Sequence, residues 1–125
     1  MRFWWAMILM VFSFPVLAEW VETGRNDRAT VYMDPGTVDK GITSHAKVWL
    51  LFDHVEDNRL YAKIYRSSKE FVEFDCDKRR YQVLTFILYP APMGMGGAID
   101  VSGGKGLWHL LDSVDIRAGI FRHVC

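Results

Sequence analysis

Alternating apolar and polar residues predict a β-strand near the middle of the chain. Residues 44–53, SHAKVWLLFD, place every second side chain from Ala46 to Phe52 on one apolar face, with Trp49 and Leu51 on the other. A strand that faces water on one side shows polar residues there, whereas this one is apolar on both. We therefore expect a central strand covered on both faces.

Two shorter strands are predicted before it, over residues 19–23 and residues 29–34, with a turn-rich segment between them. The second stops at Asp34-Pro35. Aspartate as N-cap and proline in the first helical position predict a single helical turn, which ends by Gly41.

The next segments predict hairpins. Residues 54–58, HVEDN, read as a polar turn, and residues 59–77 as a strand pair with a turn at 66–69. Aromatic and β-branched residues over 79–90 predict a strand that pairs with the preceding one. It ends at Pro90, which cannot donate to a ladder.

The last part of the chain predicts a loop and then a helix. Residues 93–106 are glycine-rich around a short apolar piece. Residues 112–125 predict an amphipathic helix capped by Asp112 or Ser113, although Gly119 weakens it by about 1 kcal/mol. Its apolar positions recur at helical spacing: Ile116, Ile120, Phe121 and Val124. Short strands followed by one helix predict an α+β domain, mostly antiparallel sheet, with the helix packed on one face.

Residues 1–18 have the pattern of a secretory signal peptide. Arg2 precedes an apolar run, then come Pro15 and small residues up to Ala18, which predicts cleavage between Ala18 and Glu19. A membrane anchor is the alternative, but the apolar run is shorter than the roughly 20 residues that a spanning helix needs. No cysteine stands at the cleavage point to carry a lipid. We expect an exported chain, periplasmic or secreted, with no transmembrane segment after cleavage.

Residues 19–125 are expected to form one domain. Cleavage removes one basic residue and leaves 14 basic against 15 acidic residues. This near balance gives no indication of nucleic acid or a membrane surface as partner. We expect a protein partner instead.

The chain has two cysteines, Cys76 and Cys125, which in an oxidising compartment most simply form one disulfide. By the loop-entropy estimate, a disulfide that closes a loop of about 50 residues stabilises the folded domain by roughly 4 kcal/mol. As a metal ligand Cys76 lacks partners, since His123 and Cys125 do not have the spacing of a zinc site. As a nucleophile it is disfavoured, because Asp75 and Asp77 would raise its pKa.

Catalytic signals are weak. The glycine-rich segment matches neither a phosphate-binding loop nor a dinucleotide pattern, the four histidines are scattered, and Ser67-Ser68 reads as part of a turn. We expect no enzyme, no cofactor and no metal. One candidate binding surface remains, a basic patch that could bind an acidic partner. It consists of Arg66, Lys69, Lys78, Arg79, Arg80 and Tyr81. The alternative is an ordinary solvated hairpin.

Several segments together resemble the surface-adhesin protein E-like domain of Gram-negative bacteria. They are the early Trp20, TVYMDPGTV at 30–38, KVWLLFD at 47–53, SSKEFVEFDCDKRR at 67–80, the Met93–Gly97 stretch, Trp108 and the closing RHVC. The resemblance implies a compact antiparallel sheet with a helix, a Cys76–Cys125 disulfide and a non-catalytic domain. It also implies binding to host extracellular proteins. The family's naming member is lipidated, whereas this chain has Ala18-Glu19 at that position, so a periplasmic role is an equal expectation.

Two other hypotheses stay open. One is a small periplasmic enzyme or ligand carrier, which would need a deep polar pocket near the glycine-rich segment, lined by Asp100, Lys105 and His109. The other is a homo-oligomer that associates through an exposed sheet edge.

Overall fold

The computed structural model describes residues 19–125. The expected signal peptide, residues 1–18, lies outside the described residues, and so does Ala18 of the expected cleavage site. The described chain folds into a seven-stranded sheet in which each neighbouring pair is antiparallel. The expected mostly antiparallel α+β fold is confirmed.

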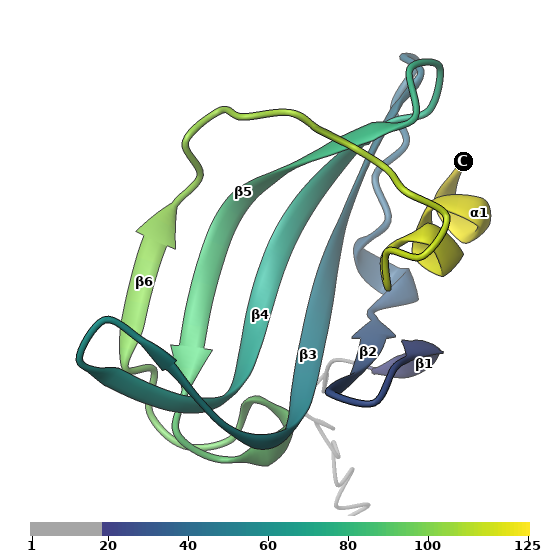
Figure 1. The fold of residues 1–125 in the computed structure, drawn as a ribbon. Helices are drawn as coiled ribbons and strands as arrows, with labels where there is room; N and C mark the ends of the chain where they lie inside the picture. Colours follow the sequence, from purple (N-terminus) through teal and green to yellow (C-terminus); the bar gives the residue numbers. More distant parts are fainter. Residues whose placement is uncertain (1–18) are drawn as a thin grey trace, which may run out of the picture.

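The sheet is a meander in the order β1-β2-β3-β4-β5-β6, with β7 added beside β5. It curves strongly, and one short helix lies against it near β2 and β3 (Figure 1). The elements are β1 (Val21–Arg25), β2 (Ala29–Met33), η1 (Pro35–Thr37), β3 (His45–Leu60), β4 (Lys63–Asp75), β5 (Arg80–Tyr89), η2 (Pro92–Gly94), β6 (Asp100–Gly103), β7 (His109–Leu110) and α1 (Ala118–Val124).

The single helical turn expected after β2 is present as the 3-10 helix η1. The Asp34 side chain accepts a hydrogen bond from the amide of Gly36, and Pro35 is the first helical residue. The central strand is also confirmed, because Leu50 and Leu51, which point to opposite faces of β3, are both fully buried.

The turns expected at 54–58 and at 66–69 are wrong. β3 continues to Leu60, and the chain reverses at Tyr61, which has a φ of 54°. A register shift between Asp53 and Asn58 leaves residues 54–57 without partners on β4, and the pairing with β4 resumes at Asn58. The polar residues mislead because strand pairing is made by the backbone, and side chains at an exposed hairpin tip need not be apolar.

Ser67 and Ser68 therefore lie inside β4 and are buried, rather than in a turn. The Ser67 hydroxyl donates to the carbonyl of Ala91 at 2.6 Å and accepts from the amide of Gly94 at 2.8 Å. These bonds fold η2 back onto the sheet. The serine is thus a structural tie between β4 and the segment after β5.

The core lies between one face of the sheet and α1. Ile120, Phe121 and Val124 pack against the buried residues of β2, β3 and β4. The helix is shorter than expected, since it begins at Ala118 and has no side-chain cap. The carboxylate of Asp112 instead accepts from the amide of Val114 in a turn that precedes the helix.

The glycine-rich segment is more ordered than the loop that was expected. Its second half forms β6, an edge strand paired with β5. From there the chain crosses the sheet past the β4–β5 turn to reach α1 (Figure 1), and Leu111 donates to the carbonyl of Arg79 on the way. We call residues 104–111 the strap.

No helix within residues 19–125 combines the length and the apolar character that crossing a bilayer requires.

Candidate binding site at the turn between β4 and β5

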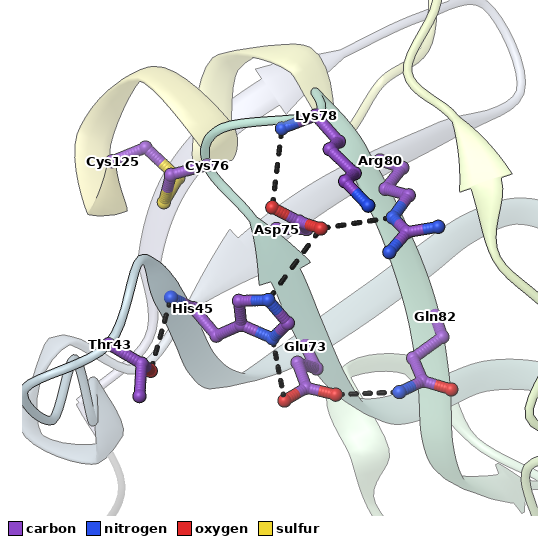
Figure 2. Close-up of polar contacts among 9 residues, drawn as sticks. All are labelled: Thr43, His45, Glu73, Asp75, Cys76, Lys78, Arg80, Gln82 and Cys125. Atoms are coloured by element: carbon purple, nitrogen blue, oxygen red, sulfur yellow. Dashed lines mark hydrogen bonds and ion pairs between the residues drawn. A yellow bond between two sulfur atoms is a disulfide. The ribbon is translucent and has the colours of Figure 1, made fainter.

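The disulfide fixes the turn that joins β4 to β5. Cys76 directly follows β4 and is bonded to Cys125, which directly follows α1 (Figure 2). Because β4 alternates, Cys76 lies on the same side as Val72 and Phe74. The bond therefore holds the end of the helix against the core face of the sheet.

Asp75 is the polar centre of the turn. Its carboxylate accepts from the Lys78 amide at 3.2 Å and from Arg80 Nε at 3.0 Å, and it lies 3.6 Å from His45 Nε2 (Figure 2). Desolvation, the largest influence, would raise the pKa of Asp75, but these hydrogen bonds and the nearby positive charges together lower it. Asp75 is thus held as a carboxylate.

His45 lies between two carboxylates that come from β4. Its Nδ1 is 3.3 Å from Glu73 Oε2, and its Nε2 faces Asp75. The other oxygen of Glu73 accepts from Gln82 Nε2 at 2.6 Å. This chain of contacts links β3, β4 and β5 at one end of the sheet (Figure 2).

The ring nitrogens of His45 face carboxylates rather than a hydroxyl or a thiol. The nearest hydroxyl drawn in Figure 2, that of Thr43, accepts from the His45 backbone amide rather than facing the ring. Nucleophilic catalysis needs a hydroxyl or thiol within hydrogen-bond reach of the imidazole. Within residues 19–125, moreover, no group of three His, Cys, Asp or Glu side chains is placed to hold a metal ion.

The expected basic patch is divided by the structure. Lys78 and Arg79 are exposed at the turn, where Arg79 lies over the ring of Phe121 and has a φ of 50°. Arg80 is engaged, paired with Asp75 and stacked 4.4 Å from the ring centre of Trp108.

The other three members do not belong to that surface. Tyr81 is buried in the core, and burial raises the pKa of its hydroxyl. Lys69 lies six residues before Asp75 on β4, about 20 Å away at strand spacing, with its Nζ beside the rings of Trp20 and Tyr89. Arg66 donates to the carbonyl of His54 and lies nine residues along β4 from Asp75, about 30 Å away at strand spacing.

A buried ion pair was missed by the sequence analysis. Arg117 Nη2 donates to Glu70 at 2.9 and 2.8 Å, and its guanidinium lies over the rings of Phe52 and Tyr81. Desolvation opposes the charge of Arg117, but attraction to Glu70 and the other nearby groups raises its pKa. The sequence contains a signal for this ion pair, because Glu70 lies two residues before Val72 and therefore on the same, core-facing side of β4.

The three residues named for a possible pocket do come together. Asp100, Lys105 and His109 line an open cleft of about 500 Å³ between the strap, β6 and the tip of the β3–β4 hairpin. Lys63 on the hairpin pairs with Asp100 at 3.1 Å and holds the tip near β6. The cleft is open, and apolar surface makes up most of its wall between polar side chains such as Asp100 and Lys105. It therefore differs from the deep polar pocket that was expected.

The comparisons with known proteins agree with this fold. The chain matches the family described as Surface-adhesin protein E over residues 20–125, and it belongs to that family. A search of curated proteins found no match.

Two solved structures are similar. Haemophilus influenzae protein E has a TM-score of 0.62 with 12% sequence identity, over 88% of this chain and 86% of that chain. The selenomethionine form of the same protein has a TM-score of 0.63, also at 12% identity, over 88% of each chain. At this identity the likeness establishes the fold alone.

Proposed function

We propose that the protein is an exported, non-catalytic binding module that recognises an acidic protein partner of the cell envelope or of a host through the β4–β5 turn. Residues 1–18 direct export, and the mature chain, which starts at Glu19, acts in the periplasm or outside the cell. Family membership supports adhesion as the general activity.

One observation carries the proposal, namely that Lys78 and Arg79 are exposed cations on a turn held rigid from several sides. The disulfide anchors one end of the turn, and Asp75 binds the Lys78 amide within it. A charged group held in a fixed position loses little conformational entropy when it binds, which favours recognition. Arg80 is already neutralised by Asp75, so it contributes shape rather than charge.

The experiment is a quantitative pull-down from envelope extracts and from soluble host extracellular proteins. Wild-type protein is compared with a double variant, Lys78→Glu with Arg79→Glu, and retained proteins are measured by mass spectrometry. We expect at least one acidic protein whose retention falls about tenfold in the double variant and weakens with added salt.

The matched control is Lys40→Glu, an exposed charge reversal outside the turn. It should retain the acidic protein as the wild type does. If wild type retains no protein above this background, or if the double variant retains the same proteins equally, recognition through the turn is wrong.

The cleft favours a second candidate function, a ligand carrier. It is formed by separate parts of the chain, which include β5, β6, the hairpin tip around Tyr61 and the strap around Leu107. Its size lies in the range of small-molecule sites, which are mostly apolar with a few polar groups. This function does not depend on the turn, so the two candidates can be tested separately.

A further inference from the structure

The face of the sheet that carries α1 is only partly covered by it. Two hollows lie on the remainder, one of about 500 Å³ beside β6 and one of about 350 Å³ beside β2 and β3. Both are lined by Phe86 on β5 and by Glu70 on β4. The two hollows therefore lie on either side of the same two side chains.

The larger hollow has apolar walls from different elements. Val83 and Phe86 come from β5, Leu60 and Tyr61 from the hairpin tip, and Leu107 from the strap. Tyr61 and Leu107 are 89% and 59% exposed, and they add to the apolar surface that Leu60, Val83 and Phe86 present at the same place. Contiguous exposed apolar surface is typical of ligand-binding grooves.

The charges that line this hollow are nearly all paired within the protein. Asp100 pairs with Lys63, and Glu70 pairs with Arg117. Lys105 differs, because within residues 19–125 no carboxylate lies in ion-pairing distance of it. An apolar hollow with one cation at its rim is complementary to a ligand with an apolar body and one anionic group.

We propose that the hollow beside β6 binds an acyl chain with an anionic head, with the chain against Phe86 and Leu107 and the head at Lys105. The inference rests on the ligand-carrier function and is independent of the β4–β5 turn.

The test is a titration of the purified, disulfide-intact protein, followed by amide chemical shifts. Laurate is compared with decanoate and with dodecyltrimethylammonium, each below its critical micelle concentration. Laurate should shift the amides of Val83, Phe86 and Leu107. Each buried methylene contributes about fourfold to affinity, so decanoate, which is two methylenes shorter, should bind about 15-fold more weakly. The cation of the same chain length should bind weakly or not at all.

Variants separate the chain from the head group. Leu107→Gln is an exposed change that should fold normally and weaken laurate binding, and Lys105→Glu should weaken it about tenfold. Lys40→Glu, outside the hollow, is the matched control and should bind as wild type does. Lauroyl lysophosphatidylglycerol, added as another arm, distinguishes a free fatty acid from an acyl chain on an anionic phospholipid.

The proposal is overturned if laurate shifts none of these amides, if the cationic detergent binds as tightly as laurate, or if Leu107→Gln and Lys105→Glu leave the affinity unchanged. The double variant Lys78→Glu with Arg79→Glu should bind laurate normally. Failure of partner binding at the turn would therefore leave this result untouched, and the reverse also holds.

Discussion

Two carboxylates on β4, Glu70 and Asp75, are buried, and each is held by an arginine. Arg117 reaches Glu70 from the segment before α1, whereas Arg80 reaches Asp75 from the neighbouring strand. A buried charge is tolerated only when it is paired and hydrogen-bonded. Both ion pairs therefore form only when the segments that supply the arginines are correctly docked against β4.

The lowered pKa of Asp75 predicts a pH dependence of stability. Because its folded pKa lies below the ordinary value of 3.8, its contribution to the free energy of unfolding is present above that pH and is lost as pH falls through the folded pKa. Asp75→Asn should be less stable than wild type at neutral pH. The difference should shrink between about pH 5 and pH 2.

Urea denaturation across that range measures the effect. Asp77→Asn is the matched control, since Asp77 is an exposed neighbour in the same turn. A difference between wild type and Asp75→Asn that stays constant down to pH 2 would contradict the assigned cause.

The pair between Glu70 and Arg117 predicts strong coupling. Arg117→Met alone leaves a buried carboxylate without its partner, so we expect a loss of about 3 kcal/mol in the free energy of unfolding. Adding Glu70→Leu should recover much of that loss. A double-mutant cycle by chemical denaturation measures the coupling, and simple additivity of the two changes would show that the pair is not coupled.

At the scale of elements, α1 docks through a close backbone contact. A Cβ built on Gly119 would lie 2.9 Å from the carbonyl oxygen of Thr23 on β1. From the sequence, this glycine was expected only to weaken the helix. The structure shows that its missing side chain lets helix and strand approach.

Gly119→Ala is therefore expected to destabilise the protein. Alanine favours an isolated helix by about 1 kcal/mol, but here its Cβ would force α1 away from β1, and we expect a net loss of at least about 1 kcal/mol. Thermal unfolding measures it. Gly97→Ala is the control, because a Cβ there meets nothing within 4 Å. A more stable Gly119→Ala protein would show that the contact is not restrictive.

The disulfide is expected to stabilise the docking of the same helix. Replacing Cys76 and Cys125 by serine should cost about 4 kcal/mol, because the bond closes a loop with a sequence separation of 49. Amide hydrogen exchange should show the largest loss of protection in α1. Unchanged protection there would contradict the view that the bond anchors the helix.

Several elements were predictable because their signal is local. β2 and the first half of β3 alternate clearly, and Asp34-Pro35 marks the start of η1 through its own side chain and ring. The second half of β3 was not predictable, because its polar residues pair through the backbone alone. The start of α1 was misplaced because Asp112 caps a turn instead of the helix.

The site was only partly predictable for a related reason. The cysteine pair follows from the count of cysteines and the expected compartment. The contact between His45 and Glu73 joins residues 28 apart, and it depends on the register between β3 and β4. Because residues 54–58 were expected to form a turn, the register between β3 and β4 could not be assigned from the sequence. His45 could therefore not be placed beside Glu73.

At the scale of the whole molecule, the protein presents two separate surfaces. The β4–β5 turn presents Lys78 and Arg79 on a rigid support, and the hollow beside β6 presents apolar surface around Phe86. The disulfide lies beside the turn and is consistent with an oxidising compartment. The account therefore depends on export of the chain with both cysteines bonded.

That claim is tested most directly by cell fractionation combined with the intact mass of the protein, measured after alkylation with and without reductant. The account predicts an exported species with the mass of residues 19–125, which reacts with the alkylating agent only after reduction. A full-length cytoplasmic species whose Cys76 and Cys125 are alkylated without reductant would contradict it.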